Sequence, residues 1–212
     1  MGVPDLGDAP LDAREIVLSA DAVEVTTAQS YSRHAASLVS AQHVRLLPET
    51  NGRKIEVFRG SVIVSPHANV DHQTVSTELV YALRQAAKAV GPFAYPEVNL
   101  ISGDDLFIPD FGVFRVSGGG KVAMNIADAL LLGEIVSPGI RRKDIIDRPK
   151  QYAAAGVPWF TRVECRNRVP VVALHSLVEG EYRPVAAAAA GTRFVMREPF
   201  SFEIDPADLL DE

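Results

Sequence analysis

The sequence contains a single cysteine, Cys165, in 212 residues, so no disulfide can form within the chain. Disulfide-stabilised secreted folds are therefore excluded, and a cytoplasmic location is expected. No apolar run approaches the roughly 20 residues that a membrane-spanning helix needs, and residues 1–10 are acidic and rich in proline and glycine, unlike a secretory signal. Neither membrane insertion nor export is expected.

Positive charge is in deficit, because 21 Lys and Arg residues oppose 27 Asp and Glu residues and give a net charge of −6. This balance argues against sequence-blind binding of nucleic acid over the whole surface. A local basic segment is nevertheless present, and it contains Arg141, Arg142, Lys143, Arg148 and Lys150. Its first three residues either contact nucleic acid or belong to an ordinary solvated helix end.

The remaining composition is that of an ordinary soluble domain, with 47% hydrophobic and 23% charged residues. Residues 1–29 show little periodicity and are expected to form a loosely ordered lead that carries no chemistry. Residues 30–212 are expected to form one domain, beginning with a helix that runs from Ser30 toward Leu47.

Apolar spacing along this domain predicts an α/β fold. Alternation on both sides of Arg59-Gly60 predicts a β-hairpin over residues 55–65, and three-four spacing predicts an amphipathic helix over residues 71–90. A nearly continuous apolar run predicts a buried central strand over 129–137. Five consecutive alanines are expected at a sheet edge. Further strands are expected at 95–101, 106–116, 159–164, 169–177, 182–187, 193–196 and 200–204, with a helix at 144–155.

Two acids interrupt apolar strands. Glu134 lies within the run LLLGEIV, and Asp110 lies within FIPDFGVF, where neighbouring residues predict burial. A buried carboxylate costs several kcal/mol unless it is paired or binds a metal. Each acid is therefore either a metal ligand or an ordinary structural residue. For Glu134 the structural alternative is a solvent-facing edge position or an ion pair with a nearby arginine, and for Asp110 it is a bulge or turn.

Two acids on separate strands, followed by a basic helix, can hold a hard divalent cation and leave positions for water and a phosphate. The surrounding motifs are IEVFRGSVIVSP at 55–66, His72, Pro109-Asp110, GEIVSPG at 133–139, and the segment from Asp144 to Pro158. In their order and spacing they resemble the Uma family of restriction endonucleases, a branch of the PD-(D/E)XK nuclease superfamily. The resemblance covers about residues 52–164.

The resemblance implies a restriction-endonuclease-like PD-(D/E)XK core, in which helices flank one mixed, curved sheet that includes the first hairpin, with a strand-rich C-terminal part. It implies Mg²⁺ or Mn²⁺ held by Asp110 and Glu134, with Glu56 as a further acid. His72 would lie near this site at the start of the long helix, or would only hydrogen-bond the adjoining loop. A DNA substrate and a homodimer are implied by the family alone.

The chain departs from the family at its lysine. The superfamily pattern has lysine two residues after the second acid, where this chain has Val136, and the Uma family has it on the next helix, where this chain has Arg148. Arg148 and Tyr152 are four residues apart and are predicted to face the same way, with Lys150 turned about 200° from Arg148. Pro149 leaves open a local rotation that brings Lys150 inward.

The catalytic residues suggested by these patterns are Asp110 and Glu134 with Arg148 or Lys150, and Tyr152 is an additional candidate. Arginine binds phosphate but is not a compact ammonium group, so weak cleavage is expected. The leading hypothesis is a metal-dependent DNA endonuclease. The alternatives are a non-catalytic protein of the same fold, with a nucleic-acid-binding or protein-interaction role, and other chemistry on the same scaffold.

Overall fold

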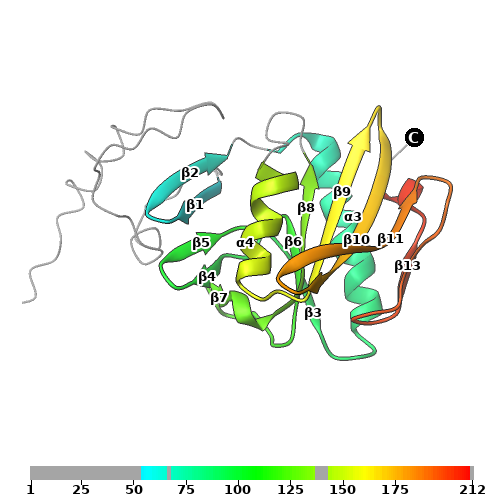
Figure 1. Cartoon of the computed structure of the whole chain (residues 1–212). Helices are drawn as coiled ribbons and strands as arrows, with labels where there is room; N and C mark the ends of the chain where they lie inside the picture. The colour runs from blue at the N-terminus through cyan, green and yellow to red at the C-terminus, as the bar shows by residue number, and fades with distance from the viewer. Residues whose placement is uncertain (1–53, 66–67, 137–142, 211–212) are drawn as a thin grey trace, which may run out of the picture.

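Figure 1 shows the protein as a computed structural model, which describes residues 54–65, 68–136 and 143–210. These residues form a six-stranded mixed sheet, a five-stranded sheet, a two-stranded ribbon and two α-helices. The α/β prediction is therefore confirmed. The expected lead at 1–29 and the helix from Ser30 lie outside the described residues. No described helix combines the length and apolar character needed to cross a membrane.

The six-stranded sheet has the strand order β11, β10, β9, β8, β6, β3, in which β8 and β9 are parallel and all other neighbours are antiparallel. Strand β8 is buried at every position except Leu130, as its apolar run predicted. The alanine run lies in β11 at the sheet edge, also as predicted. The strands are β3 (Phe93–Pro96), β6 (Phe111–Phe114), β8 (Ala129–Val136), β9 (Trp159–Arg166), β10 (Val169–Val178) and β11 (Glu181–Ala189).

Helix α3 (Val70–Ala87) covers one face of this sheet, and the expectation of a helix at 71–90 is confirmed. The Asn69 side chain caps the helix by accepting a hydrogen bond of 2.9 Å from the His72 amide. The buried stripe of α3 forms one hydrophobic core with the sheet and with the two-stranded ribbon of β12 (Phe194–Met196) and β13 (Phe202–Ile204). The stripe consists of Val75, Leu79, Val80, Leu83 and Ala87. This packing fixes the start of α3 next to the sheet.

The first hairpin belongs to a second sheet, so the expectation of one sheet that includes it is wrong. This sheet has the order β2, β1, β5, β4, β7. Within it, β1 of the hairpin pairs with β5 through Val57 and Leu106. The expected strand at 106–116 divides at Pro109, because proline has no amide hydrogen to continue a ladder. The expected strand at 95–101 divides near Glu97, which has a positive φ of 44°. The strands are β1 (Lys54–Phe58), β2 (Ser61–Ser65), β4 (Leu100–Ser102), β5 (Asp105–Phe107) and β7 (Met124–Asn125).

Helix α4 (Arg148–Ala154) lies on the face of the large sheet opposite α3 (Figure 1) and follows a π-helical segment over Lys143–Asp147. The expected helix at 144–155 is thus divided where the chain reaches Pro149, which occupies the first turn of α4, a position that needs no amide hydrogen. Arg148 and Tyr152 share one side of α4, as their spacing predicted, and both are buried there, whereas Lys150 is exposed. The proline does not turn Lys150 inward.

Gly133 allows β6 and β8 to approach closely beside the predicted acids. A Cβ atom at this position would lie 2.0 Å from Cζ of the buried Phe111 ring. We expect Gly133→Ala to lower the free energy of unfolding by about 1–3 kcal/mol, because the ring and backbone must shift. Urea denaturation measures this loss. Gly119→Ala is the control, since its Cβ would meet only Ser117 Oγ at 3.4 Å, and it should change stability by less than about 1 kcal/mol. Equal losses would contradict the packing of Phe111 on Gly133.

Candidate functional site

Asp110 lies where the chain passes from the five-stranded sheet to the six-stranded sheet, directly before β6. The antiparallel register pairs Phe111 with Gly133, which brings Asp110 beside Glu134 and Ile135 of β8. The Ile135 amide donates a hydrogen bond of 2.8 Å to Asp110 Oδ2. Both predicted acids are buried, with 6% of Asp110 and 4% of Glu134 exposed. The structure therefore brings Asp110, at the entrance to β6, beside Glu134 in the neighbouring strand β8.

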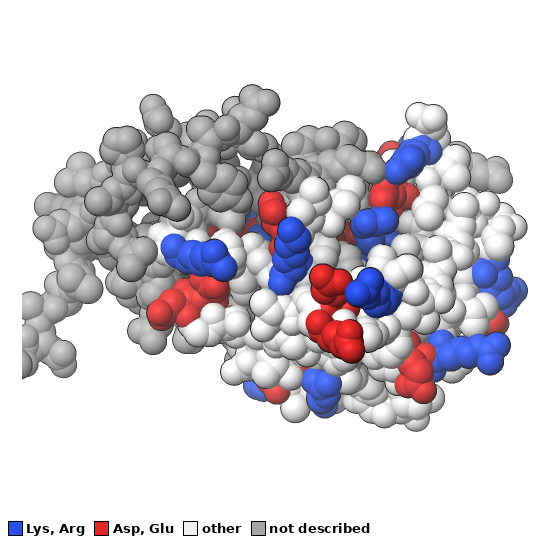
Figure 2. Space-filling model, viewed as in Figure 1, with Lys and Arg blue, Asp and Glu red and all other residues white. Residues whose placement is uncertain are grey.

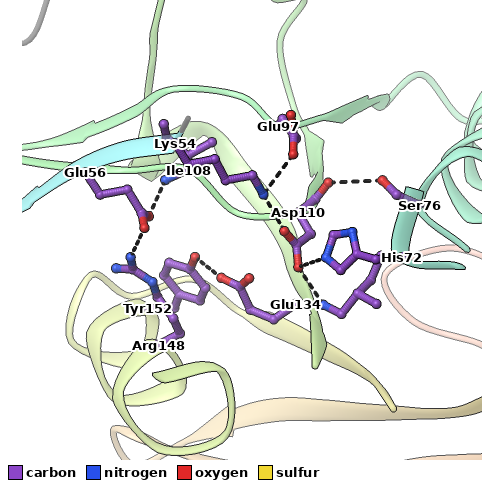
Figure 3. Close-up of polar contacts among 11 residues, drawn as sticks. Lys54, Glu56, His72, Ser76, Glu97, Ile108, Asp110, Glu134, Arg148 and Tyr152 are labelled. Carbon is purple, nitrogen blue, oxygen red and sulfur yellow. Dashed lines mark hydrogen bonds and ion pairs between the residues drawn. The ribbon is translucent and has the colours of Figure 1, made fainter. Parts of the chain in front are cut away.

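Two further groups surround the Asp110 carboxylate (Figure 3). Lys54 Nζ lies 2.5 Å from Oδ1, and His72 Nε2 lies 3.0 Å from Oδ2. Burial by itself would raise the pKa of Asp110, but the His72 hydrogen bond and the Lys54 charge hold that pKa well below its usual range. Asp110 is therefore a stable carboxylate, bound by groups from β1, α3 and β8. The family resemblance implied that His72 lies near this site, and the structure shows its imidazole beside Asp110.

Lys54 is the member of this cluster that the sequence analysis missed. Its ammonium group bridges Asp110 and Glu97, with 2.9 Å between Nζ and Glu97 Oε1. Burial is the largest single influence and lowers the pKa of Lys54, but the charges and hydrogen bonds of Asp110 and Glu97 together outweigh it, so the net shift is upward and the ammonium form persists. No local anomaly marks Lys54, which begins an ordinary amphipathic strand, and the contact joins positions 56 residues apart. Only the tertiary fold reveals it.

Glu134 is joined to α4 by a hydrogen bond. The Tyr152 hydroxyl donates a hydrogen bond of 2.5 Å to Glu134 Oε1 (Figure 3), and the Tyr152 ring packs in an apolar cluster beside Phe107 and Phe160. Burial, followed by the negative charge of Glu134, raises the pKa of Tyr152 well above its usual value. Tyr152 is therefore a neutral hydrogen-bond donor that orients Glu134.

Glu56 and Arg148 form a buried ion pair in which Arg148 Nη2 lies 2.5 Å from Glu56 Oε2. Glu56 Oε1 also accepts a hydrogen bond of 2.8 Å from the Ile108 amide. Arg148 Nη1 donates to Gln151 Oε1 at 2.6 Å, and the guanidinium lies over the Phe107 ring. Burial is the largest single influence and lowers the pKa of Arg148, but Glu56, Tyr152 and Glu134 together outweigh it and the net shift is upward. Both side chains are thus held by structural partners.

Of the remaining candidates in the basic segment, the structure describes the side chain of Lys150 alone. Lys150 is exposed on the outer side of α4. Arg141 and Arg142 lie outside the described residues, and the side chain of Lys143 is likewise not described. Nucleic-acid binding by this segment therefore stays a prediction.

A family model described as "Putative restriction endonuclease", Uma2, matches residues 41–207 of this chain. The chain belongs to the Uma2 family. It also resembles a solved structure from Anabaena variabilis ATCC 29413, described as "a putative nuclease belonging to DUF820", with 18% identity and a TM-score of 0.62. The match covers 81% of this chain and 97% of that chain, and shows a shared fold. No curated protein matches the sequence.

Uma2 membership supports a nuclease-type function and raises the question of a divalent cation. Among the described residues, no three His, Cys, Asp or Glu side chains gather as a metal-binding group. Asp110 and Glu134 still fit Mg²⁺ or Mn²⁺, because Mg²⁺ commonly takes one or two carboxylates and completes its shell with water and phosphate oxygens. The Lys54 ammonium at 2.5 Å is an observed cation on Asp110 Oδ1. Glu56 is held instead by Arg148 and the Ile108 amide.

A shallow hollow of about 230 Å³ adjoins this Uma2 site at Glu97. Tyr95, Asn99 and Lys121 contribute to its lining. Pockets for drug-sized ligands are usually about 300–1,000 Å³ and more enclosed. The hollow is smaller than such pockets.

The ion pair of Glu56 and Arg148 yields a stability prediction. Arg148→Met should lower the free energy of unfolding by about 3–5 kcal/mol, because Glu56 would stay buried without its counterion. The double variant Glu56→Leu with Arg148→Met should lose less than Arg148→Met alone, since both charges are then absent. Urea denaturation of both variants gives the comparison.

The exposed pair of Arg193 and Glu203 provides the matched control, with side chains 66% and 58% exposed. Arg193→Ala should cost no more than about 1 kcal/mol. A double variant less stable than Arg148→Met would show that the Glu56 carboxylate is satisfied without Arg148.

Proposed function

We propose that this chain hydrolyses phosphodiester bonds in DNA with a divalent cation, Mg²⁺ or Mn²⁺, held by Asp110 and Glu134. The observation that carries this proposal is the placement of two buried acids side by side in the fold, Asp110 directly before β6 and Glu134 in β8, each oriented by its own donors. Burying two carboxylates opposes folding, so their retention beside each other favours a role in binding a cation. Membership of the Uma2 family supports nuclease chemistry at this place.

The residues of the chain would prepare the site for that chemistry. A bound divalent cation would polarise the phosphate and lower the pKa of a water molecule. His72 and the Ile135 amide fix the Asp110 carboxylate, and Tyr152 fixes the Glu134 carboxylate. Such preorganisation reduces the rearrangement required when charge develops on the phosphate. We propose slow cleavage, because Val136 and Arg148 occupy the two places at which related nucleases carry lysine.

A non-catalytic role is the second candidate. Three observations favour it, namely the buried Val136, the commitment of Arg148 to Glu56, and the Lys54 ammonium on Asp110. Figure 2 shows blue and red side chains interspersed over the visible described face, with no broad area of positive charge. If the protein acts on DNA, the DNA would therefore be held locally at the site. If the protein only binds DNA, this face offers no extended basic surface for that binding.

Metal binding provides the first test of this proposal. Saturating Mn²⁺ should raise the melting temperature by several degrees, because a ligand at 100 times its Kd adds about 2.7 kcal/mol to stability. Asp110→Asn and Glu134→Gln should each remove most of the shift, since each deletes an anionic oxygen ligand. Melting scans with Mn²⁺ and with EDTA measure the difference.

Cleavage of supercoiled plasmid provides the second measurement on the same proteins. We expect slow Mn²⁺-dependent nicking that falls at least about 100-fold in Asp110→Asn and Glu134→Gln. Asp208→Asn, which changes an exposed acid of the C-terminal 3₁₀ turn, is the matched control and should behave as wild type. A Mn²⁺ shift without nicking of any nucleic acid would favour the non-catalytic role, and an unchanged shift in Asp110→Asn would refute the site.

A further inference from the structure

The ammonium group at the Asp110 carboxylate comes from the first strand of the fold. Lys54 opens β1, and its Nζ lies 2.5 Å from Asp110 Oδ1 and 2.9 Å from Glu97 Oε1. Its side chain is 17% exposed, in contrast to the 1% of Arg148. An ammonium group at this place is both in contact with a proposed cation ligand and within reach of a polymer outside the protein.

Arg148, a second positive side chain near the acids in the described part of the chain, is not available in the same way. Arg148 is bound to Glu56 and Gln151 and lies over the Phe107 ring. Releasing it would leave the Glu56 carboxylate buried without its counterion, which is strongly unfavourable. Arg148 therefore stabilises the connection between β1 and α4, and Lys54 is the cation placed to meet a phosphate.

Glu97 holds the ammonium group from the side opposite Asp110 (Figure 3). Its backbone has a φ of 44°, a conformation that is strained for a residue with a side chain, and its amide donates to the Asp110 carbonyl at 3.2 Å. This strained link connects β3 to β4 beside the site. Two carboxylates from different segments thus fix Nζ, as expected for a group that must be positioned accurately.

We propose that Lys54 is the catalytic lysine of this site, whose ammonium group contacts the scissile phosphate and stabilises its developing negative charge. This inference rests on the proposed phosphodiester hydrolysis. In that reaction a water oxygen forms a bond to phosphorus, the bond from phosphorus to one ester oxygen breaks, and a proton from the water ends on the leaving oxygen. Lys54 keeps its own proton throughout and acts by charge and hydrogen bonding. A lysine on β1 thereby replaces the lysine that α4 lacks.

The test compares Lys54→Met, Lys54→Arg and Asp110→Asn with wild type in Mn²⁺-dependent cleavage of a labelled DNA duplex. Lys54→Met should lower kcat at least about 100-fold with little change in KM, because the contact strengthens as charge develops. Lys54→Arg keeps a positive group and should recover at least about tenfold over Lys54→Met. Lys88→Met removes an exposed lysine just beyond α3 and should match wild type.

Mn²⁺ affinity in the absence of DNA, measured by calorimetry, separates the role of Lys54 from that of the metal ligands. Lys54→Met should bind Mn²⁺ at least as tightly as wild type, since it removes a competing positive charge, whereas Asp110→Asn should bind it poorly. Circular dichroism must show that both variants are folded. If Lys54→Met alone fails to fold, a Lys54→Arg variant with kcat lowered 100-fold or more would overturn the proposal, and one within tenfold of wild type would support it.

The remaining outcomes are distinct. Faster cleavage in Lys54→Met would show that Lys54 blocks the cation site, and unchanged cleavage would show that Lys54 is not used. Either result overturns the catalytic role of Lys54 and leaves the proposed hydrolysis standing. Cleavage that survives in Asp110→Asn, or is absent from every variant and from wild type, overturns the proposed hydrolysis and the Lys54 assignment with it.

Discussion

The Asp110 carboxylate is the contact on which the arrangement of the site depends. It forms an ion pair with Lys54 of β1, contacts His72 of α3 and accepts a hydrogen bond from the Ile135 amide of β8. The small sheet, the long helix and the large sheet therefore all contact this one carboxylate. None of these elements is a sequence neighbour of another. A buried ion pair seldom adds net stability over apolar packing. The cluster around Asp110 is therefore better explained by the positions that it fixes for these side chains than by a contribution to the free energy of folding.

The sequence predicts those features that arise from local patterns. Helix α3 and strand β8 follow from apolar spacing, because each buries a face or a whole segment that periodicity reports directly. Asp110 and Glu134 are recognisable for the same reason, since an acid within an apolar run must find a partner. The inward position of Arg148 and the outward position of Lys150 follow from helical geometry within one turn.

Other features could not be predicted because they depend on long-range pairing. The division into two sheets rests on the loss of a ladder hydrogen bond at Pro109 and on the positive φ of Glu97, and only the first has a visible sequence signal. The role of Lys54 depends on contacts with residues from later segments. The burial of Glu56 likewise depends on Arg148, which neutralises its charge, and on the Ile108 amide, which donates a hydrogen bond to it.

Strand β1 carries both Lys54 and Glu56 on one side, since alternate residues of a strand point the same way and lie about 6.6–6.8 Å apart. Lys54 contacts Asp110 and Glu56 contacts Arg148, so the spacing along the strand matches the spacing of two charged partners. A slip of one residue would present Ile55 and Val57 to these partners and leave buried charges on both sides uncompensated. Electrostatics therefore selects the alignment of an apolar hairpin that hydrophobic burial alone would specify only weakly.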